Sequence, residues 1–405
     1  MRYAFALLLL IGGCSGGASS RTDRAVTASG GEEALGAIQS FRTEARGEFL
    51  GLPYRSTTYY RRPSDWAMSV TGQRSFKGMV LGDKNRSYLA IGKHLMQEDG
   101  ELQMGWIHLR DAYTTMFLPD RLNEPGVKVE KADSVRIGGE KRKAITATFP
   151  GGQPMTLVFD EDSKRLHRIY FSAQEPGTED WHDWILEADG WTEVQGIQAP
   201  RATRLYTADR VEGTDEDDDA RIEEVLASRE VYETIEWNPK VADDVFKEPT
   251  NATRAQVNIK DVTPEMVGVL KVYGPFADVQ HGVRDLLDWI EKKGGEVTGD
   301  VTLLYRDRPH PQHARTKTEV QIPVDLKRYA SDSQVRVNTR QAFRMAYVTY
   351  EGPADGAYMM YGPVKAWCAK NGWRKSGPWR IRYIEFDEAT EFCKAEIGYP
   401  VRPAR

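Results

Sequence analysis

Residues 266–275 read MVGVLKVYGP, and residues 344–353 read RMAYVTYEGP. In both stretches a run rich in β-forming residues ends at a Gly-Pro turn, and the two turns are 78 residues apart. The same interval relates four further matches: Trp289 with Trp367, Lys293-Gly294 with Asn371-Gly372, Gly299 with Gly377, and Tyr305 with Tyr383. A shared interval over so many residue types indicates that one supersecondary unit was duplicated. We therefore expect two copies that pack about a pseudo-twofold axis.

Each copy has the pattern of a strand, a helix and two further strands. In the first copy, strands are predicted over 266–273, 301–305 and 318–324, and an amphipathic helix over 279–292. In the second copy, strands are predicted over 344–351, 379–384 and 395–401, and a helix over 357–370. The complete copies extend over 257–324 and 335–401, within one domain of residues 255–401.

These two units resemble the GyrI-like effector-binding domain, a fold shared with multidrug-sensing transcription regulators and SOUL-type haem binders. The resemblance spans 255–401 and includes both Gly-Pro turns and both Glu-containing strands that end in Pro-Val. It implies a cleft at the pseudo-twofold axis that takes flat, apolar or cationic small molecules. Unlike the regulators, this chain has no helix-turn-helix pattern and begins with an export signal.

The repeat pairs the candidate ligand-binding residues. Glu319 is equivalent to Glu396, and Tyr305 is equivalent to Tyr383. A buried glutamate can pair with a cationic ligand, and an aromatic face attracts a cation by about 0.5–2 kcal/mol. We expect these four side chains and Trp367 to line the cleft. Tryptophan at such a position is also typical of a helix that simply packs onto a sheet.

Three functions stay open for this domain. The preferred one is non-catalytic binding of a hydrophobic or amphipathic small molecule, with no cofactor and no metal ion. Some members of the superfamily hydrolyse reactive electrophiles with Glu and Tyr, which would make Glu396 a general base and Tyr383 a proton donor. The third function is a scaffold that holds a protein partner in the cell envelope.

Residues 29–250 read as a second domain, which is rich in strands. Segments such as 144–149, 155–159 and 166–170 alternate between apolar and polar residues and are separated by short turns, which indicates a curved antiparallel sheet. The Gly30-Gly31 helix start, Tyr60-Arg61-Arg62-Pro63 and Trp237-Asn238-Pro239 resemble the LolA/LolB-like lipoprotein-carrier fold. That resemblance implies an antiparallel half-barrel with helices, whose concave face takes acyl chains. The whole chain is thus expected to be α+β: this half-barrel, then the duplicated β-α-β-β domain.

The first residues have the layout of a bacterial lipoprotein signal. Met1-Arg2 precedes an apolar run over 3–11, which is shorter than the roughly 20 residues that span a bilayer. Ile11-Gly12-Gly13-Cys14 resembles a lipobox, so 1–14 is predicted to be the signal and Cys14 the acylated residue. Ser15 in the next position favours the outer membrane, facing the periplasm. The small, polar residues of 15–28 are typical of a tether.

Charge and cysteine content complete the expectations. The net charge is −5, and acidic and basic residues are interspersed along the chain. The sequence therefore lacks the clustered basic residues that are typical of a nucleic-acid-binding surface. Besides Cys14, the chain has only Cys368 and Cys393. An exported compartment permits a disulfide between them, and two buried free thiols are equally compatible with the pattern.

Overall fold

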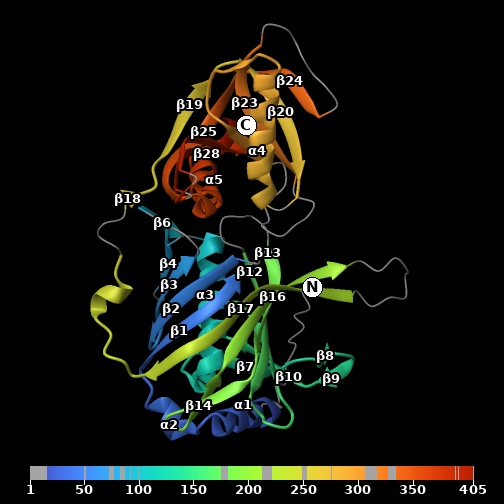
Figure 1. The fold of residues 1–405 in the computed structure, drawn as a ribbon. Helices are drawn as coiled ribbons and strands as arrows, with labels where there is room; N and C mark the ends of the chain where they lie inside the picture. The colour runs from blue at the N-terminus through green and yellow to red at the C-terminus, as the bar shows by residue number, and fades with distance from the viewer. Residues whose placement is uncertain are drawn as a thin grey trace, which may run out of the picture.

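The computed structural model describes residues 16–49, 52–72, 77–82, 87–91, 93–98, 100–174, 181–211, 221–248, 253–274, 276–305, 317–326, 334–387, 389–390 and 392–404. These residues form two lobes, each built on its own large sheet (Figure 1). Strands predominate over helices in both lobes, and nearly every neighbouring pair of strands is antiparallel.

The N-terminal lobe holds an open sheet, which has fourteen strands in the described residues. Their hydrogen-bonded order is β18 (Thr253–Arg254), β6 (His94–Glu98), β5 (Ser87–Ile91), β4 (Lys77–Gly82), β3 (Asp65–Gly72), β2 (Leu52–Arg61), β1 (Ser40–Phe49), β17 (Arg221–Trp237), β16 (Ala202–Val211), β13 (Trp181–Ala188), β12 (Leu166–Gln174), β11 (Met155–Phe159), β10 (Ala144–Thr148) and β7 (Lys128–Lys131). Two separate hairpins are β8 (Val135–Ile137) with β9 (Glu140–Arg142), and β14 (Trp191–Val194) with β15 (Ile197–Pro200). The linker strand β18 joins the edge in parallel.

Helix α3 (Gly100–Phe117) lies against this sheet (Figure 1). It contacts β5 in one half of the sheet and β12 in the other. Those strands are eight places apart in the hydrogen-bonded order, and at about 4.8 Å per place a flat sheet would separate them by roughly 38 Å. Helix α3, about 27 Å long at 1.5 Å per residue, therefore bridges the two halves of this open antiparallel sheet. Three shorter helical segments are α2 (Glu32–Gly36), η1 (Pro119–Asn123) and η2 (Asp243–Phe246).

The segment predicted to be a tether forms helix α1 (Gly16–Ala28) from its second residue on. Ala18, Ala25 and Val26 are buried against the lobe, so the helix is part of the packed structure. Alanine is the best helix former, and its small side chain permits close approach to neighbouring elements. From composition alone, the same small residues predict a flexible linker, which is why the sequence does not predict this helix.

The C-terminal lobe confirms the duplicated unit. Copy one is β20 (Glu265–Tyr273), α4 (Phe276–Lys292), β22 (Thr302–Tyr305) and β23 (Lys317–Asp325); copy two is β25 (Phe343–Pro353), α5 (Tyr361–Lys370), β27 (Trp379–Asp387) and β28 (Phe392–Pro403). The strands follow the order β19-β25-β28-β27-β22-β23-β20-β24, so the copies meet where β27 pairs with β22. The short strands β21 (Glu296–Val297) and β26 (Trp373–Lys375) pair with β23 and β28.

Two features of this lobe differ from the sequence prediction. Each copy begins with an extra strand, β19 (Val257–Val262) or β24 (Val335–Arg340). Each of these pairs with the other copy: β19 with β25, and β24 with β20. In addition, the helix predicted over 357–370 begins as a 3-10 segment, η3 (Ala354–Met360). Pro363 then falls in the first turn of α5, where its missing N–H costs no intrahelical hydrogen bond.

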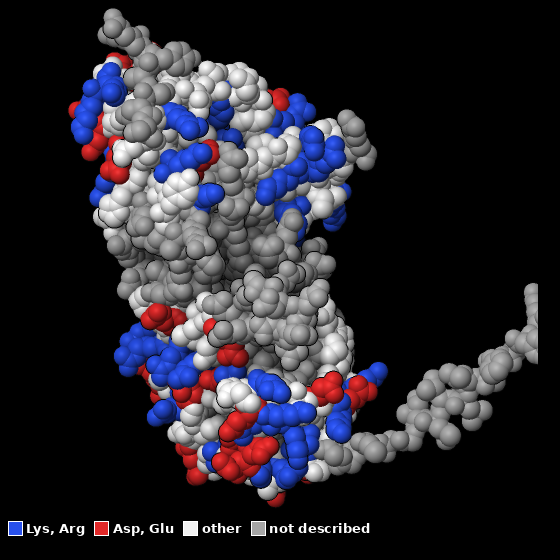
Figure 2. Space-filling view, turned by 90° about the vertical axis from the view of Figure 1, so that its right-hand side faces the viewer, with Lys and Arg blue, Asp and Glu red and all other residues white. Residues whose placement is uncertain are grey.

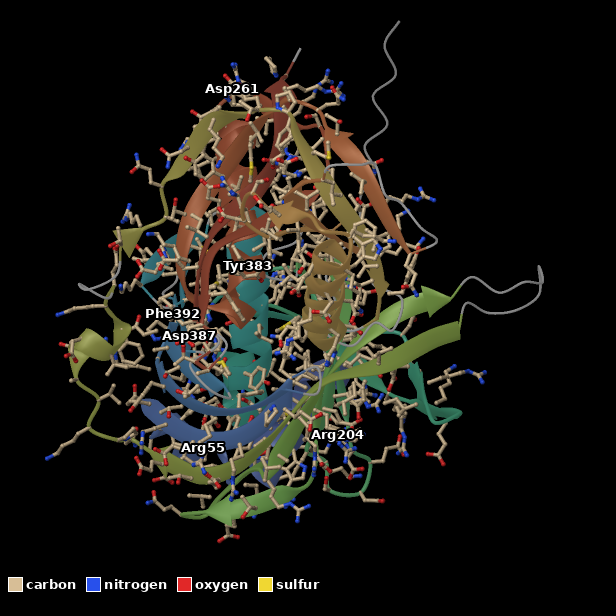
Figure 3. The ribbon with its side chains drawn as sticks, turned by 45° about the horizontal axis from the view of Figure 1, so that its top comes forward. Arg55, Arg204, Asp261, Tyr383, Asp387 and Phe392 are labelled. Carbon is tan, nitrogen blue, oxygen red and sulfur yellow. The ribbon has the colours of Figure 1, made fainter. Side chains whose placement is uncertain are left out.

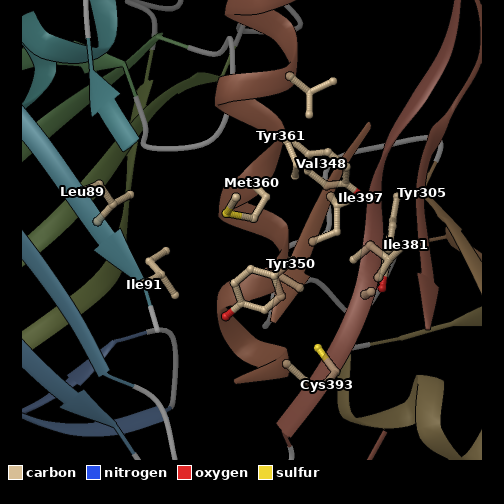
Figure 4. Close-up of a cluster of buried hydrophobic side chains, with 14 of the residues drawn as sticks. Leu89, Ile91, Tyr305, Val348, Tyr350, Met360, Tyr361, Ile381, Cys393 and Ile397 are labelled. Atoms are coloured by element: carbon tan, nitrogen blue, oxygen red, sulfur yellow. The ribbon is translucent and has the colours of Figure 1, made fainter. Parts of the chain in front are cut away.

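The two lobes are in direct contact. Ile91 of β5 belongs to the same buried cluster as Tyr350 and Met360 of copy two (Figure 4). Beside it, the Glu351 N–H donates to His94 Nε2 at 2.8 Å, and the His94 and Tyr350 ring centres are 5.2 Å apart. Segment η3–α5 therefore packs on the N-terminal lobe at one end and on the sheet of its own lobe along its length.

On the side drawn in Figure 2, basic and acidic side chains are intermixed over the N-terminal lobe, and the charged side chains in view over the C-terminal lobe are mainly basic. In the part of the chain that the structure describes, no helix has the length and apolar character needed to cross a membrane.

Candidate functional site

The site expected at the pseudo-twofold axis lies where β22 pairs with β27. Leu303 is opposite Ile381 at the centre of this pair, and Tyr305 is opposite Trp379. The Tyr383 N–H donates to the Val301 carbonyl at 2.9 Å on the other side of the centre. Because side chains alternate along a strand, Leu303, Tyr305 and Tyr383 all point to the face that carries α4 and α5. Figure 3 labels Tyr383 over the middle of the C-terminal lobe.

Five aromatic side chains form what we call the join cluster: Tyr305, Tyr361, Trp379, Tyr383 and Tyr399. The ring centres of Tyr361 and Trp379 are 3.8 Å apart, and those of Trp379 and Tyr399 are 4.6 Å apart in an edge-on arrangement. Tyr305 and Tyr361 are buried, and Trp379 and Tyr383 are partly buried against the same core. Contributions thus come from both copies and from the start of α5.

The hydroxyl groups of Tyr305 and Tyr361 are the unusual feature of the cluster. Both oxygens are buried, and neither has a hydrogen-bond partner among the described residues. Burial raises the pKa of both tyrosines well above the ordinary value, and Tyr383 adds to this increase, so both stay neutral donors. A buried polar group without a partner costs about 1–3 kcal/mol. In native structures such a group calls for a partner, which can be a water molecule, an ion or a bound ligand.

The two glutamates expected in the cleft lie on the opposite face of the sheet. Ala395 is opposite Tyr383, so the next residue, Glu396, points the other way. Arg382 Nη1 donates to Glu396 Oε2 at 3.2 Å, and Lys260 Nζ donates to the same oxygen. Glu396 is therefore already neutralised by two cations.

Glu319 shares that opposite face. It is aligned with Leu304 of β22, whereas Tyr305 is aligned with Thr318. The structure thus brings Tyr305 and Tyr383 together and separates them from both glutamates. A hydrolase that uses Glu396 as base and Tyr383 as donor would need one substrate to reach both faces of the sheet, so this geometry disfavours it.

Trp367 does not belong to the join cluster. It lies six residues along α5 from Tyr361, which at about 100° per residue places it on a different side of the helix. The residues that sequence reasoning missed are Tyr361, Trp379 and Tyr399. Their copy-one equivalents are Val283, Val301 and Ile322, so a search for matched aromatic pairs passes over them.

Cys368 and Cys393 are both buried free thiols. The Cys368 sulfur is hydrogen-bonded to the side chain of Tyr399, and burial raises the pKa of this thiol. Tyr399 is six residues along β28 from Cys393, a distance of about 20 Å in a strand. A disulfide needs Cα atoms about 4.4–6.8 Å apart, so the structure places the two cysteines too far apart for one.

The predicted acylation site Cys14 lies outside the described residues. Within the described part of the chain, no group of three or more potential metal-ligating His, Cys, Asp or Glu side chains is gathered.

Residues 255–402 match the model of a family described as GyrI-like small molecule binding domain. The C-terminal lobe is thus a GyrI-like domain, which confirms the resemblance read from the two Gly-Pro turns. No curated protein sequence matches this chain.

Three solved structures illustrate what the lobes are similar to. The EcmrR C-terminal domain is 18% identical and covers 37% of this chain and 99% of its own, with a TM-score of 0.34. A DUF1329 family protein from Desulfovibrio piger is 10% identical and covers 57% of this chain and 97% of its own, with a TM-score of 0.34. A Vibrio parahaemolyticus domain described as belonging to an outer membrane lipoprotein-sorting protein is 5% identical, with the same two coverages and a TM-score of 0.35.

Proposed function

We propose that the C-terminal lobe binds a small, flat, apolar or amphipathic molecule at the join cluster and carries out no chemistry on it. The observation that carries this proposal is the pair of buried hydroxyl groups of Tyr305 and Tyr361, which have no partner among the described residues. A ligand with a carbonyl or ether oxygen would accept their hydrogen bonds, and its flat body would lie against the apolar rings of the cluster. The match to the GyrI-like small molecule binding family supports the same conclusion.

The charges around the cluster favour a neutral ligand over a cation. Both glutamates that were expected to pair with a cation lie on the other face of the sheet, and Glu396 is already paired. Lys375 Nζ lies 4.5 Å from the centre of the Trp379 ring, so a cation is already present beside the cluster. A cationic ligand would be repelled by this ammonium group.

The test is a fluorescence titration of the full chain with 6-propionyl-2-(dimethylamino)naphthalene, a flat neutral ketone whose emission shifts in an apolar site. Tyr305→Phe and Tyr361→Phe each remove one hydrogen-bond donor and little volume. Each is expected to weaken binding about 2- to 10-fold, which corresponds to about 0.5–1.5 kcal/mol per hydrogen bond.

Tyr347→Phe is the matched control, because Tyr347 lies on the opposite face, where Lys260 Nζ is 4.7 Å from its ring centre. This variant should bind like the wild type. Equal weakening by all three substitutions, or no binding by any form, would contradict the proposal. Complete absence of binding together with retention of an envelope protein in a pull-down would favour the scaffold function.

We also propose that the protein is exported and anchored to the outer membrane through acylated Cys14. The support is the lipobox-like Ile11-Gly12-Gly13-Cys14 after an apolar run, with Ser15 in the next position. Labelling with a radioactive fatty acid tests this: wild type should incorporate label and sediment with membranes, and Cys14→Ser should do neither. Membrane association of Cys14→Ser, with no label in wild type, would sink the idea.

A further inference from the structure

The face of the C-terminal sheet opposite α4 and α5 carries several arginines, and three of them, Arg340, Arg380 and Arg382, differ in their partners. Arg382 pairs with Asp300 at 2.8 Å and with Glu396 at 3.2 Å. Arg340 pairs with Glu265. Two of the three guanidinium groups are therefore balanced by carboxylates.

Arg380, the third, has no such carboxylate partner among the described residues. It is only 8% exposed, and its Nε and Nη1 atoms are buried without a hydrogen-bond acceptor among the described residues. The Nε of neighbouring Arg340 is also without one. Burying a charged group without a partner costs several kcal/mol, which a fold tolerates when something else compensates the charge.

The electrostatics around Arg380 agree with its geometry. Burial, and then the charge of Arg340, lower the pKa of Arg380 to about 10, and Glu319 only partly opposes them. The pKa of Arg340 is lowered as well, by burial and then by Arg382. The surroundings thus hold less negative charge than these guanidinium groups require.

An apolar surface adjoins Arg380. The Phe343 ring centre is 4.5 Å from the Arg380 guanidinium carbon and 5.9 Å from that of Arg340. The same Phe343 lines a surface hollow of about 360 Å³, together with Val262, Trp373, Val401 and Pro403. This hollow lies at the end of the lobe marked by Asp261, which also lines it (Figure 3). Phe343 therefore adjoins both the hollow and the two arginines.

We propose that this face is a second binding site, which takes a small aromatic carboxylate whose carboxylate group accepts hydrogen bonds from Arg380 and Arg340. The aromatic body lies against Phe343 in the hollow. A single negative charge suits the site better than a dianion, because Glu265 and Glu319 are close to the same arginines. Both arginines lie on the other side of the sheet from the join cluster, and no residue of that cluster lines the hollow.

Benzoate and its neutral isostere benzamide are the probes, used with the full chain in calorimetric titration and thermal melts. Benzoate should bind and raise the Tm of the wild type, since a ligand that binds only the folded state stabilises it. Benzamide should do neither. Arg380→Gln should weaken benzoate binding at least tenfold. Arg336→Gln, an exposed change on the same strand as Arg340, should leave it unchanged.

A second variant separates a binding role for Arg380 from a structural one. Without ligand, Arg380→Met should melt at the wild-type temperature or above it, because it removes an unpaired buried charge. A lower Tm would show that Arg380 is held by an internal partner and would overturn the proposal. So would equal binding of benzoate and benzamide, or equal stabilisation by inorganic phosphate. Tyr305→Phe should keep full benzoate affinity, which distinguishes failure of this site from failure at the join cluster.

Discussion

Each lobe buries an arginine against an aromatic ring, and the two arginines have opposite surroundings. In the N-terminal lobe, Arg121 is 2% exposed, lies 4.7 Å from the Phe149 ring centre, and bonds to Asp111 at 3.2 Å. Burial lowers the pKa of Arg121, but Tyr60 and Asp111 outweigh it and raise that pKa above the ordinary value. In the C-terminal lobe, the pKa of Arg380 falls to about 10.

This difference suggests a way to distinguish buried polar groups that stabilise the fold from buried polar groups that bind a ligand. Burial alone does not distinguish them, because both arginines are buried. Carboxylate partners do: Arg121 lies 3.2 Å from Asp111 and 3.4 Å from Glu124, although its Nε, like that of Arg380, has no hydrogen-bond acceptor among the described residues. Glu230 of the N-terminal lobe follows the same rule as Arg121: it is buried and accepts hydrogen bonds from Tyr54 and Ser56, both at 2.9 Å. Unpaired buried groups of the C-terminal lobe gather on the two faces of one sheet.

Of the substitutions predicted to change stability, Arg121→Met should lower the stability of the protein most. A small effect would contradict the contrast drawn between Arg121 and Arg380. The change removes a partner of Asp111 and leaves that carboxylate with Arg110 alone. We expect the free energy of unfolding to fall by about 3 kcal/mol, in the range found when a buried ion pair loses one member. Urea unfolding followed by tryptophan fluorescence measures it. A loss no greater than that of Arg380→Met would show that the two arginines are equivalent.

Two buried tyrosines, one in each lobe, test the same contrast with a smaller expected change in stability. The Tyr60 hydroxyl donates to the Pro63 carbonyl at 2.9 Å, so Tyr60→Phe should destabilise the protein by about 1 kcal/mol. Tyr305→Phe removes a hydroxyl that has no partner in the described chain, so it should leave stability unchanged or raise it by up to about 1 kcal/mol. Thermal melts without ligand decide the sign. Equal losses in both variants would mean that Tyr305 is satisfied internally.

The smallest expected effect is a pH dependence of the contact between the lobes. Burial lowers the pKa of His94 from the ordinary 6.5, and Glu351 only partly opposes this. The unfolded or separated state therefore binds the proton more tightly, so stability from this contact is present above pH 6.5 and is lost as pH falls below it. Small-angle scattering should show a larger radius of gyration at pH 5 than at pH 7.5.

His94→Gln is the comparison for that measurement, because a glutamine oxygen can still accept the Glu351 N–H and does not titrate. Its radius of gyration should stay the same at both pH values. An identical expansion in this variant would place the pH sensitivity elsewhere.

Much of the C-terminal fold could be predicted from the sequence because the duplication marks its own elements. The Gly-Pro turns and the apolar face of 279–292 fixed strands and helices to within a few residues. The composition of the candidate site was harder. Equivalence by repeat says which residues correspond, but the face of a strand depends on register, and a shift of one residue reverses it. This is why Glu396 and Tyr383 were expected together and are found apart.

The exchange of β19 and β24 between the copies has a consequence for how the lobe folds. Val257 pairs with Val348, which lies 91 residues further along the chain. Neither copy can complete its own edge until the first strand of the other has been made and brought across. Pairings over such separations carry a loop-closure cost before any contact rewards it, and they slow folding. The two copies are separate in the sequence, but each needs a strand of the other to complete its sheet edge. We therefore expect the lobe to fold slowly and as a single cooperative unit.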